Sequence, residues 1–141
     1  MRASLRRLSV PSRPLEAAIT SEEIVRALST LSLEKKAENV VILDVERLVN
    51  YCDYFVICSG TNSRQVRAIA QHCMDMAESD LGVKARSVEG LSSARWILVD
   101  FGDVIMHVFD RELRDHYDLD GLWGDARRTR VEAPPPAEIP A

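Results

Sequence analysis

The sequence predicts an α/β fold in a single domain, with a mixed sheet of about five strands and flanking helices. Two observations support this fold class. Short runs of β-branched and aromatic residues alternate with segments whose apolar residues recur at helical spacing. The chain also has 141 residues, of which 46% are hydrophobic, and this is enough for one domain with a buried core.

A helix and two strands are expected first. Thr20 and Glu23 match a capping box, and apolar residues then follow at helical spacing, which predicts a helix over 21–36. The segments VVILDV at 40–45 and YFVICS at 54–59 have the length and composition of interior strands. Because the connection between them is too short for a crossover helix, we expect an antiparallel pair.

The clearest helix follows the second strand. Asn62 can cap its start, Gly82 can end it, and one apolar stripe runs along its length. A weaker strand is expected at 84–89. Because strand, helix and strand form a crossover unit, we expect this unit to be right-handed and its two strands to be parallel.

A hairpin and a short helix complete the predicted domain. The segments WILVDF at 96–101 and VIMHVF at 104–109 are separated by a two-residue Gly-Asp connection, the spacing of a tight hairpin. Asp110 can cap a short helix that extends to about residue 116, and the segment DLDGLWGD closes the domain.

The two ends differ in composition from the centre. Residues 1–14 contain four arginines and no acid, so we expect a disordered basic arm, with an organellar transit peptide as the alternative. Residues 126–141 contain four prolines and are expected to form a disordered Pro-rich tail. Residues 15–125 then remain as the folded domain.

Composition limits the compartment and the partner. The three cysteines lie in apolar segments without C-x-x-C spacing, which indicates reduced core residues in a cytoplasmic protein. No segment approaches the roughly 20 apolar residues needed to span a bilayer, so we expect a soluble protein. The net charge is -4, and the part outside the basic arm is more acidic still. This argues against direct sequence-specific nucleic-acid binding and favours a basic protein as partner.

The junction SGTNSRQ at 59–65 is the first candidate for catalysis. A glycine turn before a helix can face an anion, and nucleotidyltransferases place such a turn before a pair of metal-binding acids. Here Asp100 and Asp103 flank a hairpin turn, and Asp44 is alone on its strand. We therefore expect a glycine turn with an Asn cap, no catalytic residues and no cofactor, while a nucleotidyltransferase-type enzyme stays open as the alternative.

The three histidines are scattered along the chain, which argues against a metal site. They are His72, His107 and His116.

The segment from 95 to 125 is the most informative for function. Between Asp100 and Asp125 it holds eight acids and two arginines, and Trp96, Tyr117 and Trp123 accompany them. Aromatic anchors beside charges of one sign are typical of a surface that docks on a basic protein. Alternation along the 96–101 strand places Trp96 on the face opposite the core-facing residues. The alternative is that the tryptophans pack on helices and the acids form a solvated face.

Four strings of the chain occur together in a fixed order. They are KKAENVVILDV (35–45), CDYFVICSGTNSRQVRAIA (52–70), VEGLSSARWILVDFGDVIMHVF (88–109) and HYDLDGLWGD (116–125). With them the chain resembles the Iojap/RsfS family of ribosomal silencing factors over about 21–125. The arginine-rich arm and the proline tail have no counterpart in these motifs.

The resemblance implies a fold related to nucleotidyltransferases but without their catalytic acids. It also implies binding to the large ribosomal subunit through ribosomal protein L-fourteen, which sterically blocks the small subunit and represses translation, or a role in large-subunit assembly. Homodimers occur in the family. By their position in the motifs, the expected partner-binding residues are Trp96, Leu98, Asp100, Asp103, His107, Tyr117, Leu119, Leu122 and Trp123.

Overall fold

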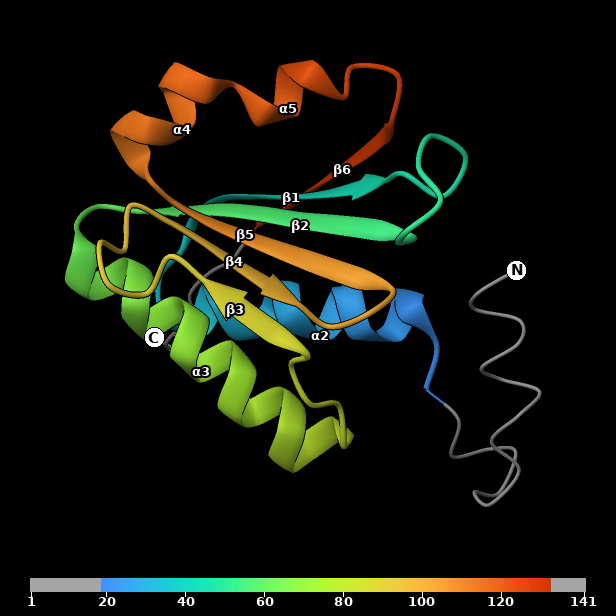
Figure 1. Ribbon diagram of the computed structural model, residues 1–141, viewed down its shortest axis with the longest axis horizontal. Coiled ribbons are helices and arrows are strands. Elements are labelled where there is room, and N and C mark those ends of the chain that lie inside the picture. Colours follow the sequence, from blue (N-terminus) through green and yellow to red (C-terminus); the bar gives the residue numbers. More distant parts are fainter. Residues whose placement is uncertain (1–18, 133–141) are drawn as a thin grey trace, which may run out of the picture.

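The computed structural model describes residues 19–132 of the chain. These residues form one mixed sheet of six strands in the order β3-β4-β5-β2-β1-β6, with helices on both faces (Figure 1). The predicted α/β class with a single mixed sheet is therefore confirmed, with one strand more than expected. The predicted basic arm at 1–14 lies outside the described residues.

Most predicted elements are present, with shifted ends. The strands are β1 (Glu38–Asp44), β2 (Tyr54–Gly60), β3 (Ser87–Glu89), β4 (Trp96–Asp100), β5 (Val104–Asp110) and β6 (Arg127–Val131). The helices are α2 (Ser21–Glu34), α3 (Ser63–Leu81), α4 (Arg111–Tyr117) and α5 (Leu119–Leu122).

The helix ends follow the predicted capping signals. Thr20 and Glu23 form the capping box of α2. The side chain of Asn62 accepts a hydrogen bond from the backbone N–H of Gln65 at the start of α3. Gly82 ends that helix in the left-handed conformation with φ of 70°. These local interactions satisfy backbone groups that the helices leave free, which explains why the helices begin and end there.

The strand pairing is antiparallel except at the centre of the sheet. The predicted antiparallel pairs β1–β2 and β4–β5 are confirmed. β2 pairs in parallel with β5, from Tyr54 opposite Val104 to Gly60 opposite Asp110. β3 runs parallel to β2, as expected for the crossover, but β5 and β4 lie between them.

The prediction of a disordered tail from residue 126 is wrong for the sixth strand. Arg127–Val131 pairs antiparallel with β1, from Asp44 opposite Arg127 to Val40 opposite Val131. The first four of its residues are exposed, so the strand has no alternating apolar pattern. Its backbone pairs with a buried neighbour, and sequence periodicity does not report such pairing. Residues 133–141 of the predicted tail lie outside the described residues.

Each face of the sheet has its own apolar core. Helices α2 and α3 cover one face, while α4 and α5 cover the other (Figure 1). Val56 and Cys58 of β2 point into the first core, and Phe55 and Ile57 into the second. β2 is therefore buried on both sides, which explains its nearly continuous apolar sequence. All three cysteines are buried and free of disulfides.

Candidate functional site

The β4–β5 hairpin separates core residues from site residues by alternation. Ile97 and Val99 are fully buried beneath the α2–α3 layer, whereas Trp96, Leu98 and Asp100 are only partly buried. The predicted alternation of this strand is therefore confirmed. The face of β4 that carries Trp96 lies on the α4–α5 side of the sheet, where the other aromatic residues gather.

Trp96 is held by contacts on three sides. Its ring stacks on Phe109, the residue opposite it on β5, with ring centroids 4.8 Å apart. It also lies against Tyr117 of α4, with a centroid distance of 5.3 Å. Its indole Nε1 donates a hydrogen bond of 3.1 Å to Nδ1 of His107. Trp96 is thus a partly exposed side chain in a fixed orientation, not a free surface anchor.

The C-terminal motif contributes both packing and exposed residues. Trp123 packs edge-on against Phe55, with centroids 5.5 Å apart, and Leu119 joins the same core. Leu122 and Tyr117 remain exposed, at 72% and 54% of their accessible surface. Some apolar side chains of this segment therefore pack, as the second alternative expects, and others face solvent.

His107 lies beneath the ring of Trp96. It is 6% exposed, and its ring contacts Phe55 edge-on at a centroid distance of 5.1 Å. Burial lowers the pKa of His107 to about 4, against a smaller opposite effect of the Asp120 charge. The ring is therefore neutral at physiological pH. Since Nδ1 accepts the bond from Trp96, the proton is on Nε2, and this buried atom has no hydrogen-bond partner in the structure.

Asp100 and Asp103, two of the predicted partner-binding residues, shape the β4–β5 hairpin turn. One carboxylate oxygen of Asp100 accepts a bond of 2.7 Å from the backbone N–H of Gly102, which has a positive φ of 98°. The carbonyl of Asp103 accepts bonds from the backbone N–H groups of Asp53 and Tyr54, at 2.7 and 3.2 Å. Asp100 thus stabilises the turn from within, whereas Asp103 connects it to the start of β2, and both residues remain partly exposed.

Two exposed apolar residues of the β1–β2 connection are not among the predicted site residues. Leu48 and Tyr51, in the β1–β2 connection, are 42% and 50% exposed. The Tyr51 ring lies 6.5 Å from that of Phe55, which in turn contacts His107 and Trp123. The sequence held one signal for them: a leucine and a tyrosine stand in a connection that was expected only to turn the chain. We define the aromatic face as Tyr51, Trp96, Leu98, Tyr117, Leu122 and Trp123.

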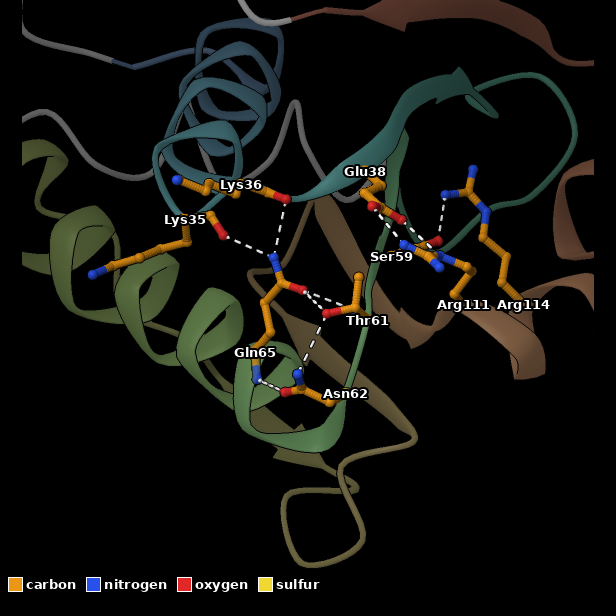
Figure 2. A network of polar contacts seen from close by, with 9 residues as sticks. All are labelled: Lys35, Lys36, Glu38, Ser59, Thr61, Asn62, Gln65, Arg111 and Arg114. Carbon is orange, nitrogen blue, oxygen red and sulfur yellow. Dashed lines mark hydrogen bonds and ion pairs between the residues drawn. The ribbon is translucent and has the colours of Figure 1, made fainter.

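The SGTNSRQ junction is a structural connection between two helices (Figure 2). The side-chain Nε2 of Gln65 donates to the carbonyls of Lys35 and Lys36, at 3.1 and 3.0 Å. Its Oε1 accepts from the backbone N–H and the hydroxyl of Thr61. With Asn62 as cap, these bonds join the end of α2 to the start of α3. The predicted Asn cap is confirmed. The predicted glycine turn is wrong at Gly60, which is the last residue of β2 and pairs with Asp110 of β5.

A polar cavity of about 300 Å³ lies between α4 and the β1–β6 edge. Four arginines line it. Arg111 forms an ion pair with Glu38 and Arg114 with Asp120, while Arg128 donates to the backbone carbonyl of Asp120. Figure 2 shows Arg111 beside Glu38, and Arg114 beside Ser59.

No three metal-ligating side chains gather anywhere between residues 19 and 132. In the same part of the chain, no helix has the length and apolar character that crossing a membrane requires.

Comparison with known proteins identifies relatives of this fold. The family model described as ribosomal silencing factor during starvation, RsfS, matches residues 18–140. The chain belongs to the RsfS family. It is 40% identical over 108 residues to the ribosomal silencing factor RsfS of Bacillus subtilis, covering 77% of this chain and 91% of that one. The resemblance seen in the four motif strings is thereby confirmed.

A solved structure and a eukaryotic relative extend the comparison. The crystal structure of a Chromobacterium violaceum protein superposes with a TM-score of 0.73 at 29% identity, covering 82% of this chain and 95% of that one. The mouse protein named mitochondrial assembly of ribosomal large subunit protein 1 is 34% identical over 101 residues. That alignment covers 68% of this RsfS-family chain and 43% of the mouse protein.

Proposed function

We propose that this protein is a ribosomal silencing factor that binds the large ribosomal subunit through ribosomal protein L-fourteen. By occupying that position it blocks association with the small subunit and represses translation. Membership of the RsfS family supports this proposal. A factor of this kind acts in the cytoplasm and works by occupancy, so it needs no catalytic residue and no cofactor.

The observation that carries the proposal is the aromatic face itself. Trp96 is fixed by Phe109 and His107, and the exposed Tyr117 lies against it. Leu122, which directly precedes Trp123, is also exposed. Rigid aromatic anchors contribute much of the energy of protein interfaces. The segment from 100 to 125, which holds Tyr117, Leu122 and Trp123, carries eight acids and two arginines, and this charge favours approach to a basic ribosomal protein.

Co-sedimentation with purified large subunits tests the proposal. Leu122→Ser removes exposed apolar surface, so we expect weaker binding with an unchanged thermal melt. Tyr117→Ser should also weaken binding, and it removes the ring that lies against Trp96, so its thermal melt is compared as well. Trp96→Ala should weaken binding further, and its melt must be measured because the ring also packs. The matched control is Gln71→Ala on α3, on the opposite side of the sheet, where the Gln71 side chain donates to Asp75. Equal binding by all variants would contradict the proposal.

A role in large-subunit assembly is the second candidate, because a mouse relative carries that name. A light-scattering assay of subunit reassociation distinguishes the two roles. A silencing factor slows the joining of mature subunits in proportion to its concentration, whereas a pure assembly factor leaves it unchanged. The same preparation, measured by light scattering during chromatography, tests the homodimer that the family resemblance implies.

A further inference from the structure

We propose that His107 is a positioning residue for the aromatic face: its Nδ1 fixes the orientation in which Trp96 meets the partner. The inference deepens the proposed function and rests on it, because it assigns Trp96 to the contact surface. His107 itself is too buried to touch a partner, so it acts through the indole above it.

The geometry of the hairpin makes this contact possible. Trp96 lies opposite Phe109, and Leu98 lies opposite His107, so Trp96 and His107 are diagonal neighbours on one face of β4 and β5. Diagonal pairs are within reach of aromatic side chains. The hydrogen bond from Trp96 Nε1 to His107 Nδ1 has a length of 3.1 Å.

Stacking alone does not determine how the indole is turned. The ring lies on Phe109 at an interplanar angle of 27°, an arrangement that a ring turned over about its second side-chain torsion could share. That torsion has broad, roughly two-fold preferences. Nε1 is the only polar atom of the indole, and an acceptor on one side of it selects one orientation. A preorganised anchor binds with less loss of conformational entropy than a mobile one.

Stability does not explain a histidine at this position. Among residues 19–132 no group accepts a hydrogen bond from its buried Nε2–H, and an unmade buried donor costs more than one hydrogen bond contributes. A phenylalanine would fill the same aromatic cluster without that cost. The histidine instead offers an acceptor that faces Trp96, and only the neutral ring can accept. Burial among Phe55, Phe109 and Trp96 keeps the ring neutral.

Affinity measurements on His107→Phe test the inference. We expect unfolding stability that is equal to or higher than that of the wild type, while affinity for the large subunit falls by about fivefold or more. His107→Asn returns an acceptor near Nδ1 and should recover part of the affinity. In a Trp96→Phe background, His107→Phe should cause no further loss of affinity. The reason is that His107 acts through the Trp96 indole, which this background lacks.

A spectroscopic measurement separates this inference from the proposed function. In a Trp123→Phe background, Trp96 is the remaining tryptophan, and its near-ultraviolet circular dichroism reports how firmly the indole is held. His107→Phe should reduce this signal, and His107→Asn should restore part of it. If the signal changes but the wild type does not bind large subunits, the proposed function fails together with the partner contact of Trp96, while the role of His107 in orienting the indole stands. An unchanged signal, or an equal affinity loss in the Trp96→Phe background, would overturn the inference.

Discussion

Arg114 and Asp120 form a two-pronged ion pair that joins α4 to α5. Nε and Nη2 of Arg114 lie 3.2 and 2.8 Å from the two carboxylate oxygens of Asp120, and both side chains are largely buried. Nη1 donates to the carbonyl of Asn39 and the hydroxyl of Ser59, at 2.6 and 2.9 Å. One guanidinium therefore fastens the segment that carries Tyr117 to the centre of the sheet.

Removal of Arg114 should destabilise the domain strongly. Arg114→Met leaves the Asp120 carboxylate largely buried without its main partner, and we expect a loss of about 3 kcal/mol in the free energy of unfolding. Urea denaturation measures this loss. The control is Arg111→Met, which breaks a solvent-exposed pair with Glu38 and should change little. Similar losses in both variants would contradict this account of the ion pair.

Stability should depend on pH through His107. Its pKa is about 4 in the folded state, against an ordinary value of 6.5, because burial disfavours the charged ring. Between these values the unfolded chain binds more protons than the folded one, so stability falls as pH decreases through this window. From pH 7 to pH 5 we expect His107 to account for a loss of about 2 kcal/mol.

Urea denaturation at the two pH values checks this dependence. Other groups also titrate, so the informative quantity is the difference between the wild type and His107→Phe. We expect the variant to lose less stability on acidification, by the amount assigned to His107. The same pH dependence in both proteins would refute the assignment.

Gly90 should tolerate no side chain, whereas Gly82 should. A Cβ atom on Gly90 would lie 2.1 Å from the carbonyl oxygen of Trp96, and its φ is 89°. Gly90→Ala must therefore displace the start of β4, at an expected cost of about 3 kcal/mol. Gly82 has a comparable φ of 70° but open space around it, so Gly82→Ala should cost about 1 kcal/mol.

The two glycine variants also differ in their effect on the aromatic face. Because Gly90 abuts the backbone of Trp96, Gly90→Ala should also reduce affinity for large subunits at a temperature where the variant is still folded. Gly82→Ala, at the far end of α3, should bind normally. Thermal melts and co-sedimentation of both variants give the comparison, and a Gly90→Ala protein as stable as Gly82→Ala would disprove the steric argument.

Gln65 should contribute stability that its exposure does not suggest. Gln65→Ala removes four hydrogen bonds that link α2, Thr61 and α3, and we expect a loss of about 2 kcal/mol. Gln71→Ala, on the same helix, removes a single contact with Asp75 and should have little effect. Chemical denaturation of the two variants measures the difference. Equal free energies of unfolding would show that the Gln65 hydrogen bonds do not hold α2 and α3 together.

Local sequence patterns predicted most of the secondary structure. The apolar stripe of α3, the caps at Thr20 and Asn62, and the alternation along β4 each depend on residues a few positions apart. Such patterns report which side of an element is buried, so they could be interpreted without knowing the neighbours. The motif strings added the family, because their order along the chain is distinctive.

Only the tertiary structure decided which residues meet. β6 forms because its backbone pairs with β1, and its exposed arginines gave no periodic signal. Within the predicted site, folding placed His107 beneath Trp96 and left Leu122 exposed. Arg114 reaches the carbonyl of Asn39 across 75 positions of the sequence. Contacts of this kind depend on the order of strands in the sheet and on the face each helix covers, and no local pattern contains either.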